Sequence, residues 1–242
     1  MKNILTSLIL LGVAASLQAG TPAKAPVAIQ PQKGDGNVIF YSHDRRDGAN
    51  YNALGWYHAL NNDLSLSGLF TRAAVGVGQY DYTNPGNVTG TLFDADAGLG
   101  YRYVTQHLVI GGSTALHLRD RNLSAIDPAN NVGTDWGVRF GLDATGSYGS
   151  LYYSAMGQIS TVEWAIWSRY RLGYKFDRFT IGPEFVFLND AQFTERRMGG
   201  FLMVQVCDKL SASFYFGSAD FGSSNGGNGN TPYGGIGLSY TF

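Results

Sequence analysis

The sequence is poor in cysteine and in charge. Cys207 is the only cysteine, so no intramolecular disulfide can form and the fold must hold together without one. Charged residues make up 14% of the chain, and the formal net charge of -1 lacks the basic excess typical of nucleic-acid-binding proteins. We therefore expect neither a disulfide-stabilised fold nor a nucleic-acid partner.

Long apolar runs are also missing beyond the N-terminal segment. A membrane-spanning helix needs about 20 apolar residues, and no stretch of that length follows. Glycine, by contrast, reaches 33 residues, and Tyr and Phe reach 15 and 14. Many glycines and aromatics with few charges suit a β-barrel in lipid. Any membrane span must therefore consist of strands.

The N-terminal segment has the pattern of a secretory signal peptide. Lys2 precedes an apolar run from Ile4 to Leu17, and small residues surround Ala19. We predict a signal peptide over residues 1–19 that is cleaved after Ala19. A retained membrane anchor is the alternative, which is disfavoured because the run is short for a spanning helix. Residues 20–36 contain three prolines and little periodicity, which predicts a flexible or extended periplasmic linker.

From residue 37 to residue 242, side chains alternate between two faces. In the segment 93–103, apolar and aromatic side chains share one face, while Asp94, Asp96 and Arg102 share the other face with glycines. The segments 136–144, 169–176 and 179–187 repeat this pattern. A period of two is strand periodicity, and one of the two faces is apolar enough for lipid.

The connectors between these segments alternate between short and long. Short ones lie near 61–63, 105–106, 146–149, 177–178 and 207–209, and the longer ones are "HDRRDGAN", "TNPGNVTG", "DRNLSAIDPANNVGTD", "STVE", "NDAQFTER" and "SSNGGNGNT". Five short and six long connectors imply twelve strands with both chain ends on the short-turn side. The sequence thus predicts an all-β fold, an antiparallel up-and-down transmembrane β-barrel over residues 37–242.

The first long connector and a proline inside a predicted strand each lead to a separate expectation. His43 and Asp44 fall in the first long connector, where we expect a solvated outer loop. Pro183 falls inside a strand, where it removes a ladder hydrogen bond. We therefore expect a local bulge at Pro183, or a strand that begins late.

A soluble periplasmic sandwich or lipocalin-like barrel would also alternate, but with its charged face outward. The secretory signal, the connector lengths and the final strand favour the membrane barrel. In that strand Ile236, Leu238, Tyr240 and Phe242 share one face, and the ending resembles the last strand of bacterial outer-membrane barrels. We therefore expect the protein in the outer membrane of a Gram-negative bacterium, in contact with its lipid.

Three stretches of the chain resemble a known family. They are "ALNNDLSLSGLFTRAAVGVGQYDY", "DRNLSAIDPANNVGTDWGVRFGLDA" and "RYRLGYKFDRFTIGPEFVFLNDAQFTERRMGGF", with "ALNNDL", "DPANNVGT" and "IGPE" as the most specific pieces. They cover much of 59–201 and are similar to the cellulose biosynthesis protein BcsS family. The resemblance implies a secreted barrel associated with bacterial cellulose production, and it brings no catalytic residues.

The inward face of the predicted barrel carries the candidate functional residues. The lumen-lining candidates are Arg72, Asp94, Asp96, Arg102, His117, Arg119, Arg139, Asp143, Trp167, Arg169, Arg171, Lys175, Glu184 and Tyr215. Twelve strands lie between the filled eight-stranded barrels and the open sixteen-stranded ones. Such mixed charge can therefore plug the lumen or line a narrow pore.

Short turns predict two pairings on this face. A two-residue turn at 105–106 places Asp94 opposite His117, and a turn at 177–178 places Arg171 opposite Glu184. Ser113 lies four residues from His117, roughly 13 Å along a strand, which is too far for a nucleophile. We interpret the Asp-His pair as structural. Two neighbouring carboxylates are too few for a Ca²⁺ site, so we predict no catalytic residue, metal or cofactor.

Two functions from different classes remain. The first is a non-enzymatic outer-membrane barrel that serves cellulose biosynthesis or secretion, as a narrow saccharide conduit or as a docking element for the synthase or secretion apparatus. The alternatives are a lipid-modifying barrel hydrolase, which needs Ser, His and an orienting group near one rim, and a general small porin. The sequence places no such trio at one rim.

Overall fold

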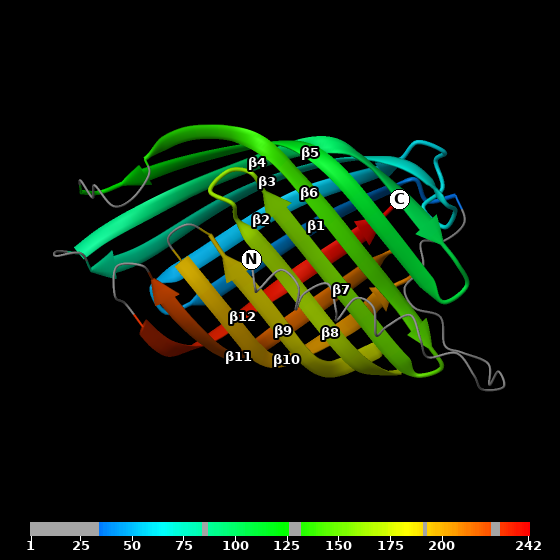
Figure 1. Ribbon diagram of the computed structural model, residues 1–242. Coiled ribbons are helices and arrows are strands. Elements are labelled where there is room, and N and C mark those ends of the chain that lie inside the picture. Colours follow the sequence, from blue (N-terminus) through cyan, green and yellow to red (C-terminus); the bar gives the residue numbers. More distant parts are fainter. Residues whose placement is uncertain (1–33, 84–86, 126–131, 191–192, 224–227) are drawn as a thin grey trace.

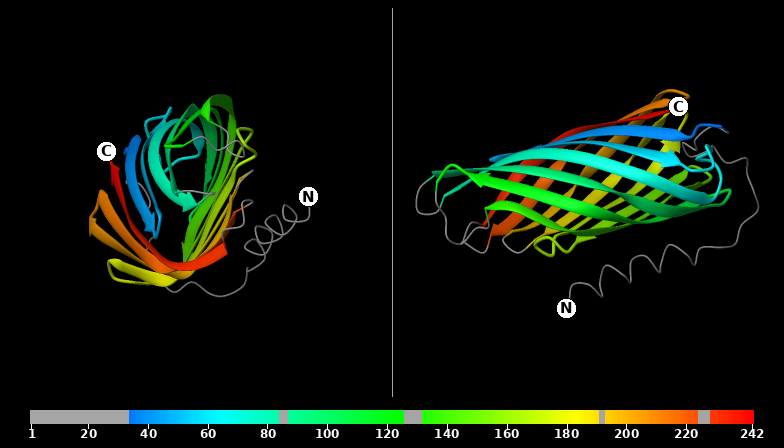
Figure 2. Two further views of the ribbon diagram at one scale, coloured as in Figure 1. Left: turned by 90° about the vertical axis from the view of Figure 1, so that its left-hand side faces the viewer. Right: turned by 90° about the horizontal axis from the view of Figure 1, so that it is seen from above.

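The barrel predicted from the sequence is confirmed. The computed structural model describes residues 34–83, 87–125, 132–190, 193–223 and 228–242. These residues form one closed antiparallel barrel in which all twelve strands pair with their sequence neighbours and β12 pairs with β1 (Figures 1 and 2). The predicted signal peptide and the first residues of the predicted linker lie outside the described residues.

The twelve strands differ in length. They are β1 (Asn37–Arg46), β2 (Ala49–Ala59), β3 (Gly68–Thr83), β4 (Asn87–Val104), β5 (Leu108–Leu123), β6 (Gly133–Tyr148), β7 (Leu151–Ser160), β8 (Ile166–Phe176), β9 (Phe179–Asn189), β10 (Phe193–Cys207), β11 (Leu210–Ser223) and β12 (Asn228–Thr241). The wall formed by β3–β6 is therefore taller than the wall formed by β7–β9, as Figures 1 and 2 show.

Alternation along each strand separates an apolar outside from a polar inside. Leu99, Leu116, Trp136 and Leu142 are among the exposed outward side chains, with exposures of 58–71%. The polar side chains between them are buried inside the barrel. A soluble barrel would reverse this arrangement, because its apolar side chains would fill the core. Among the described residues no helix is long and apolar enough to cross a membrane.

Connector lengths agree only in part with the prediction. At the end of the barrel where β1 starts and β12 ends, here called the turn end, the connectors are 60–67, 105–107, 149–150, 177–178 and 208–209. At the opposite loop end, the first connector is only Asp47–Gly48, with Gly48 at φ 66°. The predicted outer loop with His43 and Asp44 is therefore wrong, because both residues belong to β1.

Pro183 causes less disturbance than predicted. It lies within β9, and the pairing of β8 with β9 has the same register before and after it. The neighbouring β10 also pairs past Pro183 without a shift, through Gly200. The expectation of a bulge or a late strand start is wrong, since the missing N–H interrupts the pairing locally without displacing it.

The connector 60–67 folds inward at the turn end. Leu64 is 2% exposed, its carbonyl accepts a hydrogen bond from Arg102 Nη1 at 3.1 Å, and its N–H donates to the Asp35 carbonyl at 2.8 Å. Lys209 Nζ in turn donates to Asp35 Oδ1 at 2.8 Å, and this bond raises the pKa of the Lys209 ammonium. The last residues of the predicted linker are therefore attached to the barrel.

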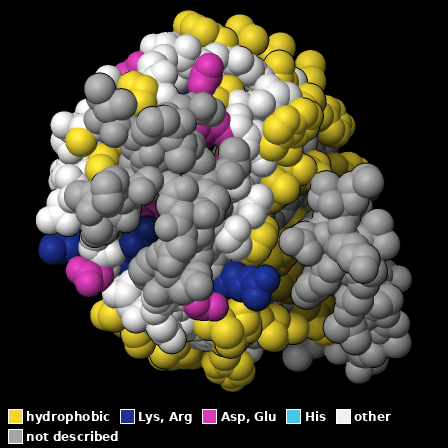
Figure 3. Space-filling model, turned by 60° about the vertical axis from the view of Figure 1, so that its left-hand side comes forward, with side chains coloured by type: hydrophobic (Ala, Val, Ile, Leu, Met, Phe, Trp, Pro, Cys, Tyr) yellow, Lys and Arg dark blue, Asp and Glu magenta, His cyan; other side chains and the backbone are white. Residues whose placement is uncertain are grey.

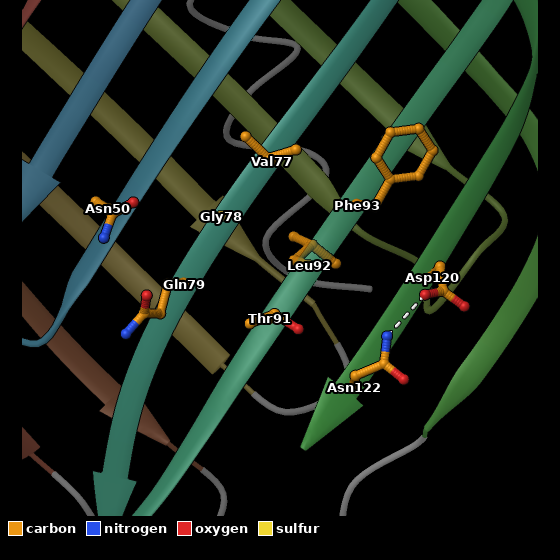
Figure 4. Close-up of a pocket in the computed structure, with 9 residues that line it drawn as sticks. All are labelled: Asn50, Val77, Gly78, Gln79, Thr91, Leu92, Phe93, Asp120 and Asn122. Atoms are coloured by element: carbon orange, nitrogen blue, oxygen red, sulfur yellow. Dashed lines mark hydrogen bonds between the residues drawn. The ribbon is translucent and has the colours of Figure 1, made fainter. Parts of the chain in front are cut away.

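An apolar belt surrounds the barrel, and its limit near the loop end is visible as a change in side-chain type. Figure 3 shows hydrophobic side chains over the side wall that is in view. Near the loop end, a hollow of about 360 Å³ on the outer face of β2–β5 has Val77 and Phe93 on one side (Figure 4). Five of its other lining side chains are polar, and Asn122 Nδ2 donates to Asp120 Oδ2 at 2.9 Å. The hollow thus marks the limit of the lipid-facing belt on the side of the loop end.

Candidate functional site

The structure places every predicted lumen residue on the inward face of its strand. Strand by strand they are Arg72 on β3, Asp94, Asp96 and Arg102 on β4, His117 and Arg119 on β5, Arg139 and Asp143 on β6, Trp167, Arg169, Arg171 and Lys175 on β8, Glu184 on β9 and Tyr215 on β11. They do not form one site. Most of them gather in two networks on opposite walls of the lumen, whereas Arg102 bonds the Leu64 carbonyl at the turn end.

The first network surrounds Asp94 and Asp96 on β4. Arg119 Nε lies 3.1 Å from Asp94 Oδ1, and Arg72 Nη2 lies 2.8 Å from Asp96 Oδ1. Arg139 reaches both carboxylates from β6. These carboxylates are at most 6% exposed, so each is paired with guanidinium groups, as buried charge requires.

His117 belongs to the same network, although the predicted register was wrong. Val104 pairs with Val109, because His107 belongs to the turn, and Asp94 therefore lies opposite Arg119 while Asp96 lies opposite His117. The contact itself is present, since His117 Nε2 lies 2.7 Å from Asp94 Oδ1 along the diagonal. A shift by two residues keeps every side chain on its face, which is why the contact survives.

Ser160 was missed by the sequence reasoning and completes a chain of hydrogen bonds. Its Oγ lies 2.7 Å from His117 Nδ1, so Ser160, His117 and Asp94 are connected in the order of a hydrolase triad. Yet His117 is 0% exposed, Ser160 is 2% exposed, and Ser160 Oγ also accepts the Val162 N–H at 3.1 Å. The His117 and Ser160 side chains are therefore almost completely covered by protein.

The second network surrounds Glu184 on β9, which is 0% exposed. Arg171 Nε donates to Glu184 Oε2 at 2.6 Å, Tyr233 OH donates to Oε1 at 3.3 Å, and Arg169 Nε lies 3.6 Å away. The predicted pairing of Arg171 with Glu184 and of Phe176 with Phe179 is confirmed. The two-residue turn at 177–178 fixed that register.

Aromatic rings pack beneath these arginines. The Arg169 guanidinium lies 4.8 Å from the centre of the Tyr215 ring, and Arg171 lies 4.9 Å from that of Phe201. Such guanidinium-ring contacts stabilise a cation that is withdrawn from bulk water. Tyr215 is only 2% exposed, so its ring face is occupied by protein and is not free to stack on a sugar.

Several lumen charges were absent from the sequence-based set. Asp44 on β1 lies 3.6 Å from Arg169 on β8 and 3.1 Å from Arg197 on β10, and Arg46 Nε lies 3.1 Å from Glu195 Oε2. These pairs join strands that are not neighbours, so their side chains cross the lumen near the loop end. The sequence pattern predicts Asp44 in an outer loop, and its inward position on β1 was therefore not expected.

A small cavity lies beside the first network. Its volume is about 70 Å³, and it is lined by Arg119, Arg139, Ser160 and Trp167 among others. Trp167 is partly exposed, unlike Tyr215, and Arg169 lies 5.3 Å from its ring centre. Of the two aromatic lumen-lining candidates, Trp167 is therefore the one whose side chain is still partly accessible. Within the described ranges, no group of three His, Cys, Asp or Glu side chains is arranged to hold a metal ion.

The chain resembles outer-membrane barrels of known structure. An outer membrane channel from Pseudomonas putida superimposes with a TM-score of 0.55 at 13% identity, covering 93% of this chain and 100% of the other. The KdgM porin gives 0.46 at 15% identity over 85% and 99% of the two chains. The translocator domain of the autotransporter NalP from Neisseria meningitidis gives 0.47 at 11% identity over 100% and 96%. At 13% identity the likeness to the Pseudomonas putida channel establishes the fold alone.

The family comes from the sequence itself. No curated protein matches the chain. The model of the family described as cellulose biosynthesis protein BcsS matches residues 38–242, which is the whole barrel except its first residue. The resemblance inferred from the three stretches is thus confirmed, and this twelve-stranded outer-membrane β-barrel belongs to the cellulose biosynthesis protein BcsS family.

Proposed function

We propose that the protein is a non-enzymatic, narrow saccharide conduit of the cellulose-producing apparatus in the outer membrane. The observation that carries the proposal is the partly exposed Trp167 beside a cavity inside a lumen of polar side chains. An aromatic ring among hydrogen-bonding groups is a surface on which sugar rings stack. The buried Ser160 and His117 support a structural role for the hydrolase-like trio.

The conduit must be narrow, because side chains cross it. Arg169 and Arg197 reach Asp44 from the far wall, and Leu64 fills part of the turn end. These groups restrict passage to thin, flexible or small solutes. A docking element for the synthase or secretion apparatus is the second candidate, and the same crossing pairs favour it, because they obstruct the lumen.

Single-channel recording of refolded protein tests the proposal. We expect small conductance steps that cello-oligosaccharides block, with malto-oligosaccharides of equal length as the control for linkage. Heat-modifiable migration in gels confirms that each sample is a closed barrel. A well-folded protein without conductance would contradict the conduit and favour the docking role.

A further inference from the structure

The connector 161–165 between β7 and β8, here called the inner segment, folds against the inside of the barrel wall. The Thr161 N–H donates to the Val138 carbonyl at 2.9 Å, and the Thr161 hydroxyl accepts the Val138 N–H at 2.9 Å. Val162 is 4% exposed and lies against Gly137, which faces the lumen on β6. Because β6 extends past β7 at the loop end, the inner segment has a wall to lie on.

Glu163 anchors the inner segment to a pair of arginines on β5. Its Oε2 accepts a hydrogen bond from Arg119 Nη1 at 2.7 Å and another from Arg121 Nη2 at 2.8 Å. The Glu163 side chain is 3% exposed, and the two arginine side chains are at most 10% exposed. One carboxylate oxygen thus occupies a site made by two guanidinium groups, the arrangement that proteins use to bind carboxylate or phosphate ligands.

The backbone of the inner segment is strained where the anchor sits. Glu163 and Trp164 have φ angles of 55° and 49°, the left-handed region that non-glycine residues rarely adopt. Two such residues in succession persist only where surrounding contacts hold them. The Ala165 N–H donates to the Val162 carbonyl at 3.2 Å and the Ser160 N–H to the Ala165 carbonyl at 2.8 Å, so Glu163 and Trp164 are the central residues of a type I′ hairpin turn. Such turns favour Asn and Gly at these positions, so the ion pairs of Glu163 add contacts to a turn that its own residue types disfavour.

We propose that Arg119 and Arg121 form a binding site for the carboxylate or phosphate group of a solute, and that Glu163 is its resident, displaceable occupant. A solute anion that replaces Glu163 frees the inner segment from the wall and widens the lumen. The cavity lined by Arg119, Ala165 and Trp167 borders the anchor through Arg119 and is the side from which a small anion would approach. The inference rests on the proposed conduit, because it describes how that conduit opens.

The charge of Glu163 is tested against a matched carboxylate. Glu195 is also bridged by two arginines, Arg46 and Arg197, and is equally buried, but it belongs to β10 and not to a connector. In planar bilayers, Glu163→Gln should shift the ratio of closed to open time toward the open state by at least about tenfold, because it removes a buried ion pair. Glu195→Gln makes the same charge change at a pair that crosses the lumen, and it should keep the wild-type response of this ratio to an added anion, because Glu163 remains in place.

A second arm tests the ligand. Millimolar glucuronate or inorganic phosphate should raise the open fraction of the wild type, whereas neutral glucose should not, and Glu163→Gln should no longer respond. Conductance in the wild type with equal behaviour of Glu163→Gln and Glu195→Gln would overturn the inference and leave the conduit standing. No conductance in any folded variant would overturn both, and conductance only in Glu163→Gln would support the anchor directly.

Discussion

Arg171 and Glu184 are direct cross-strand partners on β8 and β9, and Arg171 Nε lies 2.6 Å from Glu184 Oε2. Glu184 is fully buried, so removal of Arg171 leaves a carboxylate whose remaining polar contacts within the described part of the chain are Tyr233 and the more distant Arg169. We expect Glu184→Ala and Arg171→Ala each to destabilise the barrel, and the double change to cost less than their sum, by about 1–3 kcal/mol.

Urea unfolding of the refolded barrel in detergent or lipid measures this coupling through a double-mutant cycle. The surface pair Asp177 and Arg178, in the adjoining turn, is a control, because an exposed turn carries little coupling. Strictly additive unfolding free energies for Arg171 and Glu184 would contradict the role of their ion pair.

Gly98 on β4 should tolerate no side chain. A Cβ atom at Gly98 would lie 2.1 Å from the Thr114 carbonyl oxygen and 2.4 Å from Ala115 Cα, which are backbone atoms that cannot turn aside. Gly98→Ala should cost about 1–3 kcal/mol through overpacking. Gly112→Ala on β5 is the matched control, since its Cβ would meet only Leu142 Cδ2 at 3.5 Å. Equal unfolding midpoints for the two variants would disprove this account.

The Ser160, His117 and Asp94 chain should be chemically silent. Ser160 is 2% exposed, so we expect a fluorophosphonate probe not to label the folded wild type, whereas a serine hydrolase of known activity labels under the same conditions. Mass spectrometry locates any adduct. Labelling that disappears in Ser160→Ala would refute the non-enzymatic proposal and revive the hydrolase.

Ion selectivity should favour anions weakly. The structure adds Arg46, Arg121 and Arg197 to the inward positive charges, and Asp44, Glu163 and Glu195 to the negative ones. The lumen residues named from the sequence contain more basic than acidic side chains, and the structure adds equal numbers of both. The basic excess therefore remains, and we expect a modestly positive potential inside the lumen. Reversal potentials in a salt gradient measure it; a preference for cations would contradict the assignment.

Trp167 should matter for sugar and not for ions. We expect Trp167→Ala to weaken the block by cello-oligosaccharides while the conductance in salt changes little, because the ring provides a stacking face next to the cavity. Tyr215→Phe is the comparison, since Tyr215 is buried and its ring is covered by Arg169. An unchanged block in Trp167→Ala would remove the main support for saccharide contact.

The barrel was predictable because its rules are local. Alternation and turn residues gave the strand count, the inward set and the register across the turn at 177–178, where two residues connect β8 and β9. The predicted register across the turn after Val104 was wrong, because nothing in the sequence marks His107 as a turn residue and not as a strand residue. The prediction of a long first outer loop was wrong, because its polar residues continue β1 and β2 as paired strands. Asp47 and Gly48 alone form the turn.

The networks were less predictable because they depend on the width of the lumen. Contact between Ser160 on β7 and His117 on β5 crosses an intervening strand, and contact between Asp44 and Arg169 crosses the lumen itself. Strand alternation tells which face a side chain occupies, but not which distant side chain on that face it meets. The ion pairs of Glu163 could not be predicted either, because Glu163 lies in a connector that turns inward.

The junction of β1 with β12 differs from every other neighbouring pair of strands in the barrel. All the other pairs are hairpins, whereas here Asn37 and Phe242 exchange backbone hydrogen bonds at 2.9 and 3.0 Å across 205 positions of the chain. Bringing such distant segments together carries the largest loop-closure entropy in the molecule. In the described barrel this is therefore the pairing that no turn holds together, and we expect it to form after the hairpins on either side of it.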